Sequence, residues 1–265
     1  MPVAVRVAPT ARRWRLQAKP FDMKRLGAKS STTIALILVF SWGSSVWAQS
    51  ADPSGSFPSR QQDDLTDVKG ALQDSIRLLV MQHLFRIGFQ DKTRRELGGP
   101  FFADYARSLR LPARWSDGDG WFTNNIEHPY QGAATGFIWL NNSKGGQLAI
   151  TMDRAYWSSR LAATAFAAAY SLQFEIGPLS EASIGNVGLN PRTVGWTDHV
   201  MTPVGGLIVM VGEDAIDQFV LRHVEQRIHS GFVCATVRML LNPARSGANV
   251  AALQAPWHRA GRPCM

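Results

Sequence analysis

The sequence predicts a mainly α-helical protein, a single-domain helical bundle that follows an N-terminal signal peptide. Apolar residues recur at intervals of three and four over several long segments, which is the spacing of one helix face. One of these segments is rich in alanine, the residue with the highest helix propensity. Residues 49–265, which remain after the signal peptide, are long enough to enclose a sizeable core in one domain.

The segment from Met23 to Gln49 has the layout of a secretory signal peptide. A basic start precedes an apolar stretch at residues 34–40, and Val46 and Ala48 stand at the −3 and −1 positions of a signal peptidase site. We therefore expect residues 1–48 to be an N-terminal extension and signal peptide, and the protein to be exported to the periplasm or cell envelope. The alternative is an uncleaved N-terminal transmembrane anchor, although the apolar stretch is shorter than the ~20 residues that span a bilayer. The alternative to Met1 as the true first residue of the protein is Met23.

The positive charge of the chain lies in this N-terminal segment. The whole sequence has 28 Lys and Arg against 20 Asp and Glu, a net charge of +8. Residues 1–48 hold 8 of these basic residues and 1 of the acids, so residues 49–265 carry a net charge of only +1. The charge balance therefore predicts no nucleic-acid partner.

The domain is predicted to begin after a linker and to consist of helices of different lengths. Residues 49–63 are rich in Ser, Pro and Gly, which indicates a flexible linker, and a helical domain is expected over residues 64–241. A β-hairpin across residues 141–146 is the alternative to two antiparallel helices there. Long helices are expected near 66–89, 153–174 and 213–229, and shorter ones near 101–109 and 129–141.

Glycine, proline and aspartate residues mark the expected turns and the chain end. The Asp-Gly-Asp-Gly stretch at residues 117–120 predicts a plain turn, since the further oxygen ligands of a calcium-binding loop are missing. Pro203, Gly205 and Gly206 interrupt the next long apolar run, which predicts a turn there. The Pro-, Gly- and Ala-rich residues 242–265 are expected to form a loose C-terminal tail.

The chain has two cysteines, Cys234 and Cys264. In an oxidising compartment they can form one disulfide. The place of Cys264 next to the last residue favours the alternative, in which Cys234 is a small buried hydrophobe and Cys264 belongs to a frayed tail. No Cys/His spacing typical of a metal site occurs.

Several polar residues lie inside or directly beside apolar segments. His128 precedes Pro129 at the start of an expected helix, and Asp198 and Glu213 lie on either side of one apolar run. A buried polar group without a partner costs about 1–3 kcal/mol, so we expect His128, Glu181, Asp198 and Glu213 to meet at one place. Further members of this expected polar cluster are Asn124, Asn125, Glu175 and Ser183. Structural turns are expected at Pro129, Gly132, Pro203, Gly205, Gly206 and Gly212.

Four short motifs follow one another over residues 120–225, namely NNIEHPYQG, LSEAS, DHVMTPVGG and GED. This order resembles a bacterial family of unknown function. Its members have an N-x-x-x-H-P-x-x-G segment, an acidic-plus-serine loop, and an Asp followed by a Thr-Pro-x-Gly-Gly turn and a Gly-Glu pair. The resemblance implies an exported, envelope-associated protein and no particular reaction. The chain departs from the pattern at Phe174, where a Trp is expected before Glu175. The resemblance marks Asn124, His128, Pro129, Gly132, Glu181, Ser183, Asp198, Gly206, Gly212 and Glu213.

Two functions are compatible with these residues. The first is a non-enzymatic exported protein that docks to a membrane surface, an envelope component or a partner, with the polar residues holding its helices in register. The second is a hydrolase or transferase acting on an envelope lipid or glycan, with His128 as general base and Asp198 and Glu213 as orienting acids or metal ligands. No HExxH, GxSxG or P-loop motif occurs. The sequence therefore does not decide whether the protein binds a metal or a cofactor, or whether it is an enzyme. One solvent-connected pocket holding all three residues favours the second function, whereas burial or dispersal favours the first.

Overall fold

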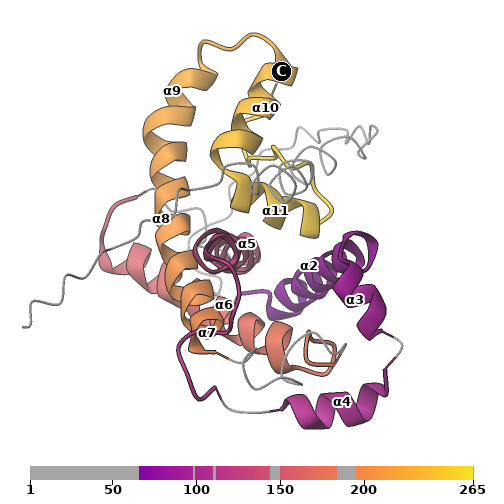
Figure 1. The fold of residues 1–265 in the computed structure, drawn as a ribbon. Coiled ribbons are helices and arrows are strands. Elements are labelled where there is room, and N and C mark those ends of the chain that lie inside the picture. Colours follow the sequence, from indigo (N-terminus) through magenta and orange to yellow (C-terminus); the bar gives the residue numbers. More distant parts are fainter. Residues whose placement is uncertain (1–65, 98, 110–111, 144–149, 184–194, 265) are drawn as a thin grey trace, which may run out of the picture. The chain divides into compact units, whose positions relative to one another are not determined.

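The structure is a computed structural model that describes residues 66–97, 99–109, 112–143, 150–183 and 195–264 (Figure 1). Every regular element within these ranges is a helix, so the predicted mainly α-helical fold is confirmed. The predicted signal peptide at residues 1–48 and the linker at 49–63 lie outside the described residues. So do residues 144–149, in which part of the alternative β-hairpin falls.

The first long helix of the domain lies where the apolar spacing predicts it. α2 (Val68–Phe89) begins after Asp67, whose side chain accepts a hydrogen bond from the N–H of Gly70 at 2.9 Å and so caps the helix. The short α3 (Asp91–Glu96) and α4 (Phe101–Ser108) follow.

α5 (His128–Asn141) is the central helix of the domain. A π-helical turn, η2 (Thr123–Glu127), leads into α5, and almost all side chains of α5 are buried. It packs against α6 (Arg154–Ile176), α8 (Gly206–Ile216) and α11 (Pro243–Ala251), and Figure 1 shows it nearly end-on between them. The residues that form this core include many alanines, which let neighbouring helices approach closely.

The turns predicted at Pro203, Gly205, Gly206 and Gly212 are wrong, because the chain there is helical. Pro129 and Gly132 likewise lie inside α5 and not in a turn. One helical run extends from residue 196 to residue 225, so it begins well before the start predicted at Glu213. Pro203 is tolerated because it lies in a π-helical turn, where the hydrogen-bond ladder of the α-helix is locally interrupted. The run consists of α7 (Trp196–Val200), η4 (Met201–Gly205), α8 (Gly206–Ile216), η5 (Asp217–Leu221) and α9 (Arg222–Glu225).

Glycines allow α5 and this helical run to cross in backbone contact. A Cβ atom on Gly132 would lie 1.7 Å from the carbonyl oxygen of Thr202, and one on Gly206 would lie 2.6 Å from the carbonyl carbon of Gly132. Neither position has room for any side chain. Gly212 differs, since a Cβ there would meet nothing within 4 Å.

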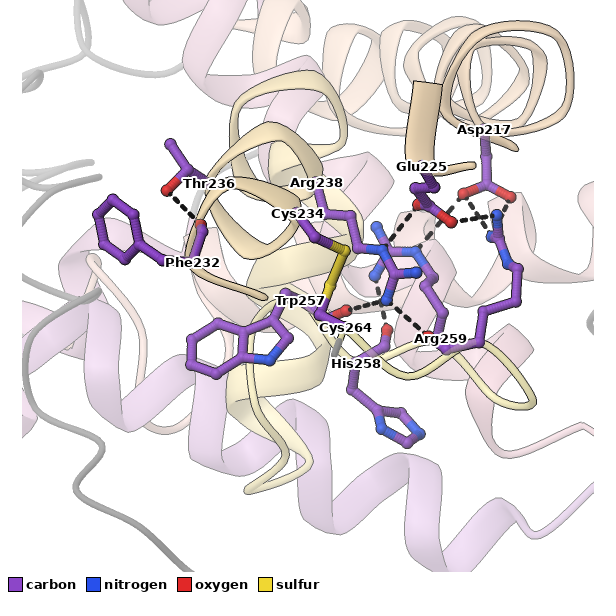
Figure 2. Close-up of a disulfide and its surroundings, with 11 residues drawn as sticks. Asp217, Glu225, Phe232, Cys234, Thr236, Arg238, Trp257, His258, Arg259 and Cys264 are labelled. Atoms are coloured by element: carbon purple, nitrogen blue, oxygen red, sulfur yellow. Dashed lines mark hydrogen bonds and ion pairs between the residues drawn. A yellow bond between two sulfur atoms is a disulfide. The ribbon is translucent and has the colours of Figure 1, made fainter. Parts of the chain in front are cut away.

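The predicted loose tail is also wrong, because the C-terminal residues fold onto the domain. After α10 (Gly231–Leu241), α11 (Pro243–Ala251) packs against α5 and buries Asn249. A disulfide joins Cys234 in α10 to Cys264, as Figure 2 shows, so the alternative of unpaired cysteines does not hold. This bond closes a loop and so restrains the last residues of the chain. The composition of the sequence alone does not reveal this restraint.

The distribution of polar and apolar side chains between the interior and the surface of the described residues is unusual. Buried polar or charged residues outnumber buried hydrophobic ones, and half of the latter are alanines. Large hydrophobic side chains are instead exposed on almost every described helix. None of the described helices is both long and apolar enough to cross a bilayer.

The helix crossing predicts unequal effects of alanine at two glycines. Gly132→Ala should destabilise the protein by about 3 kcal/mol or more, since the new methyl group displaces one backbone from the other. Gly212→Ala is the matched control in open space, and the helix propensity of alanine should raise stability by about 1 kcal/mol. Urea unfolding measures both values, and an equal effect at the two positions would contradict the crossing.

Candidate functional site

A histidine–aspartate pair lies where α5 meets the helical run. His128 is the first residue of α5, and its Nε2 lies 2.9 Å from Oδ1 of Asp198 in α7. Its Nδ1 lies 3.3 Å from the hydroxyl oxygen of Thr202, one turn further along the run. His128 is 5% and Asp198 6% exposed, so the pair is inside the protein.

Glu175 brings a second carboxylate to this pair from the last turn of α6. One ligand atom from each of His128, Glu175 and Asp198 lies within 4.8 Å of the other two. Glu181 lies close by, since its backbone N–H donates to the carbonyl oxygen of Phe174 and its carboxylate forms an ion pair with Arg86 of α2. Three of the four residues expected to meet are therefore in one region.

Asp117 belongs to the same region, although the sequence assigns it only to a turn. The N–H groups of Trp196 and Thr197 donate to the carbonyl oxygens of Arg114 and Trp115, which fixes this segment against the start of α7. The Asp117 and Asp198 carboxyl groups then lie within hydrogen-bonding reach of each other. Two carboxylates in contact need a proton or a cation between them.

The expected asparagines and serine have different roles. The side-chain amide of Asn124 donates to Oδ1 of Asp117 at 3.3 Å, so Asn124 supports the region. Asn125 instead donates to the carbonyl oxygen of Trp121 within its own helical turn. Ser183 donates its hydroxyl to the carbonyl oxygen of Ser180 and shapes the turn after α6.

We define the polar centre as Asp117, His128, Glu175, Glu181 and Asp198. Its charges shift one another's pKa values. Burial raises the pKa of Asp198 to about 6, partly offset by the neighbouring imidazole of His128. Burial and the charges of Glu181 and Asp198 raise the pKa of Glu175 well above its usual range. Burial lowers the pKa of His128, but the Asp198 contact and the charge of Glu181 outweigh it and raise the pKa overall. His128, Glu175 and Asp198 therefore hold protons more tightly than exposed groups do.

Glu213, the fourth residue expected to meet the others, lies elsewhere. Its carboxylate accepts hydrogen bonds from the N–H groups of Ala244 at 2.7 Å and Arg245 at 2.9 Å, so it caps the start of α11. The separation follows from the continuous helical run. Asp198 and Glu213 are fifteen residues apart on it, which corresponds to about 22 Å along a helix axis.

Asp214, which no sequence pattern singled out as a pair with Arg160, forms a second buried network. The guanidinium of Arg160 and the hydroxyl of Tyr156 donate to its Oδ2 at 2.8 Å and 3.0 Å. Arg245 donates to its Oδ1 at 2.5 Å. Spacing along the sequence could not identify these partners, because they come from α6 and α11.

Chemically, the polar centre offers one imidazole nitrogen and two carboxylate oxygens to a cation. Such a donor set fits Zn²⁺ or Mn²⁺, and His128, Glu175 and Asp198 would hold the ion. The same groups can also transfer protons near neutral pH, since their pKa values are raised. All three are buried, so a substrate would need an opening to reach them.

Comparisons of this chain with protein-family models, with curated proteins and with solved structures find no match. The resemblance to a bacterial family of unknown function therefore stays a prediction.

Glu213 predicts a pH dependence of stability. Burial raises its pKa to about 7 from an ordinary value of 4.5, against the hydrogen bonds that lower it. The unfolded chain therefore ionises first as pH rises, and folding loses about 3 kcal/mol between pH 4.5 and pH 7 through this residue. Glu213→Gln should remove this part of the pH dependence.

Urea unfolding at pH 4.5 and pH 7 measures the effect, with Glu127→Gln as a control at an exposed glutamate. The raised pKa values of Asp198 and Glu175 act in the same direction, so the wild-type protein should be less stable at the higher pH. An identical pH dependence in Glu213→Gln and the wild-type protein would refute the assignment.

Proposed function

We propose that this is an exported, envelope-associated protein that docks to a membrane surface through apolar side chains. The buried polar centre holds its helices together. The observation that carries the proposal is an apolar ridge on α2, which we call the α2 ridge and define as Val68, Leu72, Ile76, Val80 and Leu84.

The α2 ridge is a second apolar face, on the outside of a helix whose inner side buries Ala71 and Leu79. Its five residues follow one another at every fourth position, and each is between 46% and 62% exposed. On the inner side of the same helix, Asp74 and Ser75 are buried at 7% and 6% exposure. A surface helix of a soluble domain faces its apolar stripe inward, and none of the described residues covers this ridge, so we expect an apolar partner there.

A lipid surface fits this partner better than one protein does. A single protein partner covers about 800 Å² on one side, whereas large apolar side chains are exposed on almost every described helix. Trp115, Trp121 and Trp196 are among them, and tryptophan is enriched where proteins meet the membrane interface. Because no described helix can span a bilayer, α2 would lie in the plane of the interface.

The disulfide supports export. Disulfides persist in oxidising compartments and are rare in the cytosol, so a bond between Cys234 and Cys264 agrees with the predicted signal peptide. His128 is buried, and Glu213 lies apart from His128 and Asp198. Both observations favour a structural role for these polar residues over a catalytic one.

A second candidate function is a metal-dependent hydrolase or transferase acting on an envelope lipid or glycan. The observation in its favour is the approach of His128, Glu175 and Asp198 to within 4.8 Å. His128 would be the general base or a ligand, and Glu213 would take no part in it. This function needs a movement that opens the polar centre to substrate.

Membrane docking predicts co-sedimentation of the purified protein with phospholipid vesicles. Replacing both Leu72 and Ile76 by glutamate should weaken vesicle binding about tenfold or more, because two apolar side chains leave the lipid. Gln73→Glu is the matched control, since it adds a charge at an exposed position outside the ridge. Circular dichroism checks that all variants stay folded.

Two outcomes would sink this proposal. One is a wild-type protein that stays in the supernatant with every vesicle composition. The other is a stable dimer or protein complex that the double glutamate variant disrupts, which would make the α2 ridge a protein interface.

A further inference from the structure

A cavity of about 290 Å³ lies on the side of the domain where the C-terminal segment meets the helical run. Five arginines line it, against two aspartates, so its wall carries a surplus of three positive charges. The arginines come from four parts of the fold, namely α6, α9, α11 and the segment after α11. They are Arg160, Arg222, Arg245, Arg259 and Arg262.

Both aspartates of the cavity wall already accept hydrogen bonds from some of these arginines. Asp214 accepts from Arg160 and Arg245, as described above. Asp217 accepts two hydrogen bonds from Nη2 of Arg262, at 2.7 Å and 2.6 Å. These contacts leave some buried N–H groups of the arginines without a hydrogen-bond acceptor among the described residues.

Arg259 shows this most clearly. Its residue is only 8% exposed, and its Nη2 has no hydrogen-bond partner among the described residues. Its Nε lies 3.6 Å from Oδ1 of Asp217, which is too long for a hydrogen bond. Nε of Arg245 is also buried without a partner in the described part of the chain. Figure 2 shows Arg259 beside Asp217, in the segment that the disulfide ties to α10.

The charges in the cavity also disturb Arg259 itself. Burial and the neighbouring positive charge of Arg245 lower the pKa of Arg259 to about 10. Buried donors without acceptors and crowded positive charges are both relieved by a bound anion. Arginine is the side chain that best matches the oxygens of phosphate, which it contacts in a planar fork.

We propose that this cavity binds a phosphate monoester group, with Arg222, Arg245 and Arg259 as its principal donors. A phosphate monoester carries a charge close to −2 at neutral pH, which fits a surplus of three positive charges better than a single carboxylate does. Free phosphate and a phosphorylated lipid headgroup share this chemistry. The site does not depend on the membrane-docking function, because its residues are distinct from the α2 ridge.

Isothermal titration of the full protein with inorganic phosphate tests the site. We expect binding with a Kd of about 1 mM or tighter, and at least tenfold weaker binding in Arg259→Gln. Arg222→Gln should weaken binding similarly and leave folding intact, because Arg222 is exposed at the mouth of the cavity. Arg227→Gln is the control, since Arg227 is exposed outside the cavity wall and should bind phosphate as the wild-type protein does.

Vesicles with and without phosphatidic acid distinguish the two sources of phosphate. Added affinity for phosphatidic acid that Arg222→Gln abolishes would assign a lipid headgroup, and phosphate binding without such a gain would assign a soluble ligand. Binding to phosphatidylcholine vesicles reports only on the α2 ridge. The proposal is overturned by a wild-type protein that does not bind phosphate, or by Arg227→Gln weakening it as much as Arg222→Gln does.

Discussion

The backbone contact between α5 and the helical run is the constraint on which the rest of the structure depends. Gly132 and Gly206 meet without side chains between them, and the carbonyl oxygen of Thr202 fills the place of a Cβ. His128 lies one turn before Gly132, and Asp198 lies one turn before Thr202. The crossing therefore brings these two side chains together, and their contact at 2.9 Å closes the same junction.

Such close helix packing explains why the interior is polar. Helices in backbone contact leave room for alanine and glycine but for few large apolar side chains. Many other interior positions hold polar or charged groups, and several of the charges are paired, as Arg160 and Asp214 are. The large apolar residues of the same helices then lie on the outside, where a lipid surface can cover them. One packing constraint thus accounts for both the polar centre and the apolar surface.

The sequence predicted the parts of the fold that depend on local spacing. α2, α5 and α6 lie where apolar periodicity and alanine content placed them. A turn was predicted at Pro203 because proline and glycine break most helices. The prediction was wrong because Pro203 lies in a π-helical turn and Gly206 lies at a helix crossing, where a residue without a side chain is needed. The wrong placement of Glu213 in the polar centre follows from the wrong turn, since a turn at Pro203 would have folded Glu213 back toward Asp198.

Other features required information from distant parts of the chain. Asp117 reaches Asp198 only through backbone hydrogen bonds between residues 114–115 and 196–197. The disulfide depends on α11 returning the last residues to α10, which the composition of residues 242–265 does not indicate. The arginines of the cavity likewise come from four segments, and no local motif in the sequence predicts their meeting.

A double-mutant cycle on His128 and Asp198 tests most directly whether their contact holds the helix crossing together. Urea unfolding in the presence of EDTA compares His128→Ala, Asp198→Ala, the double variant and the wild-type protein. The account predicts a coupling free energy of about 2 kcal/mol or more, because either single change leaves a buried group without its partner. Additive effects in EDTA, with coupling that appears only when Zn²⁺ or Mn²⁺ is added, would contradict it and favour a metal centre.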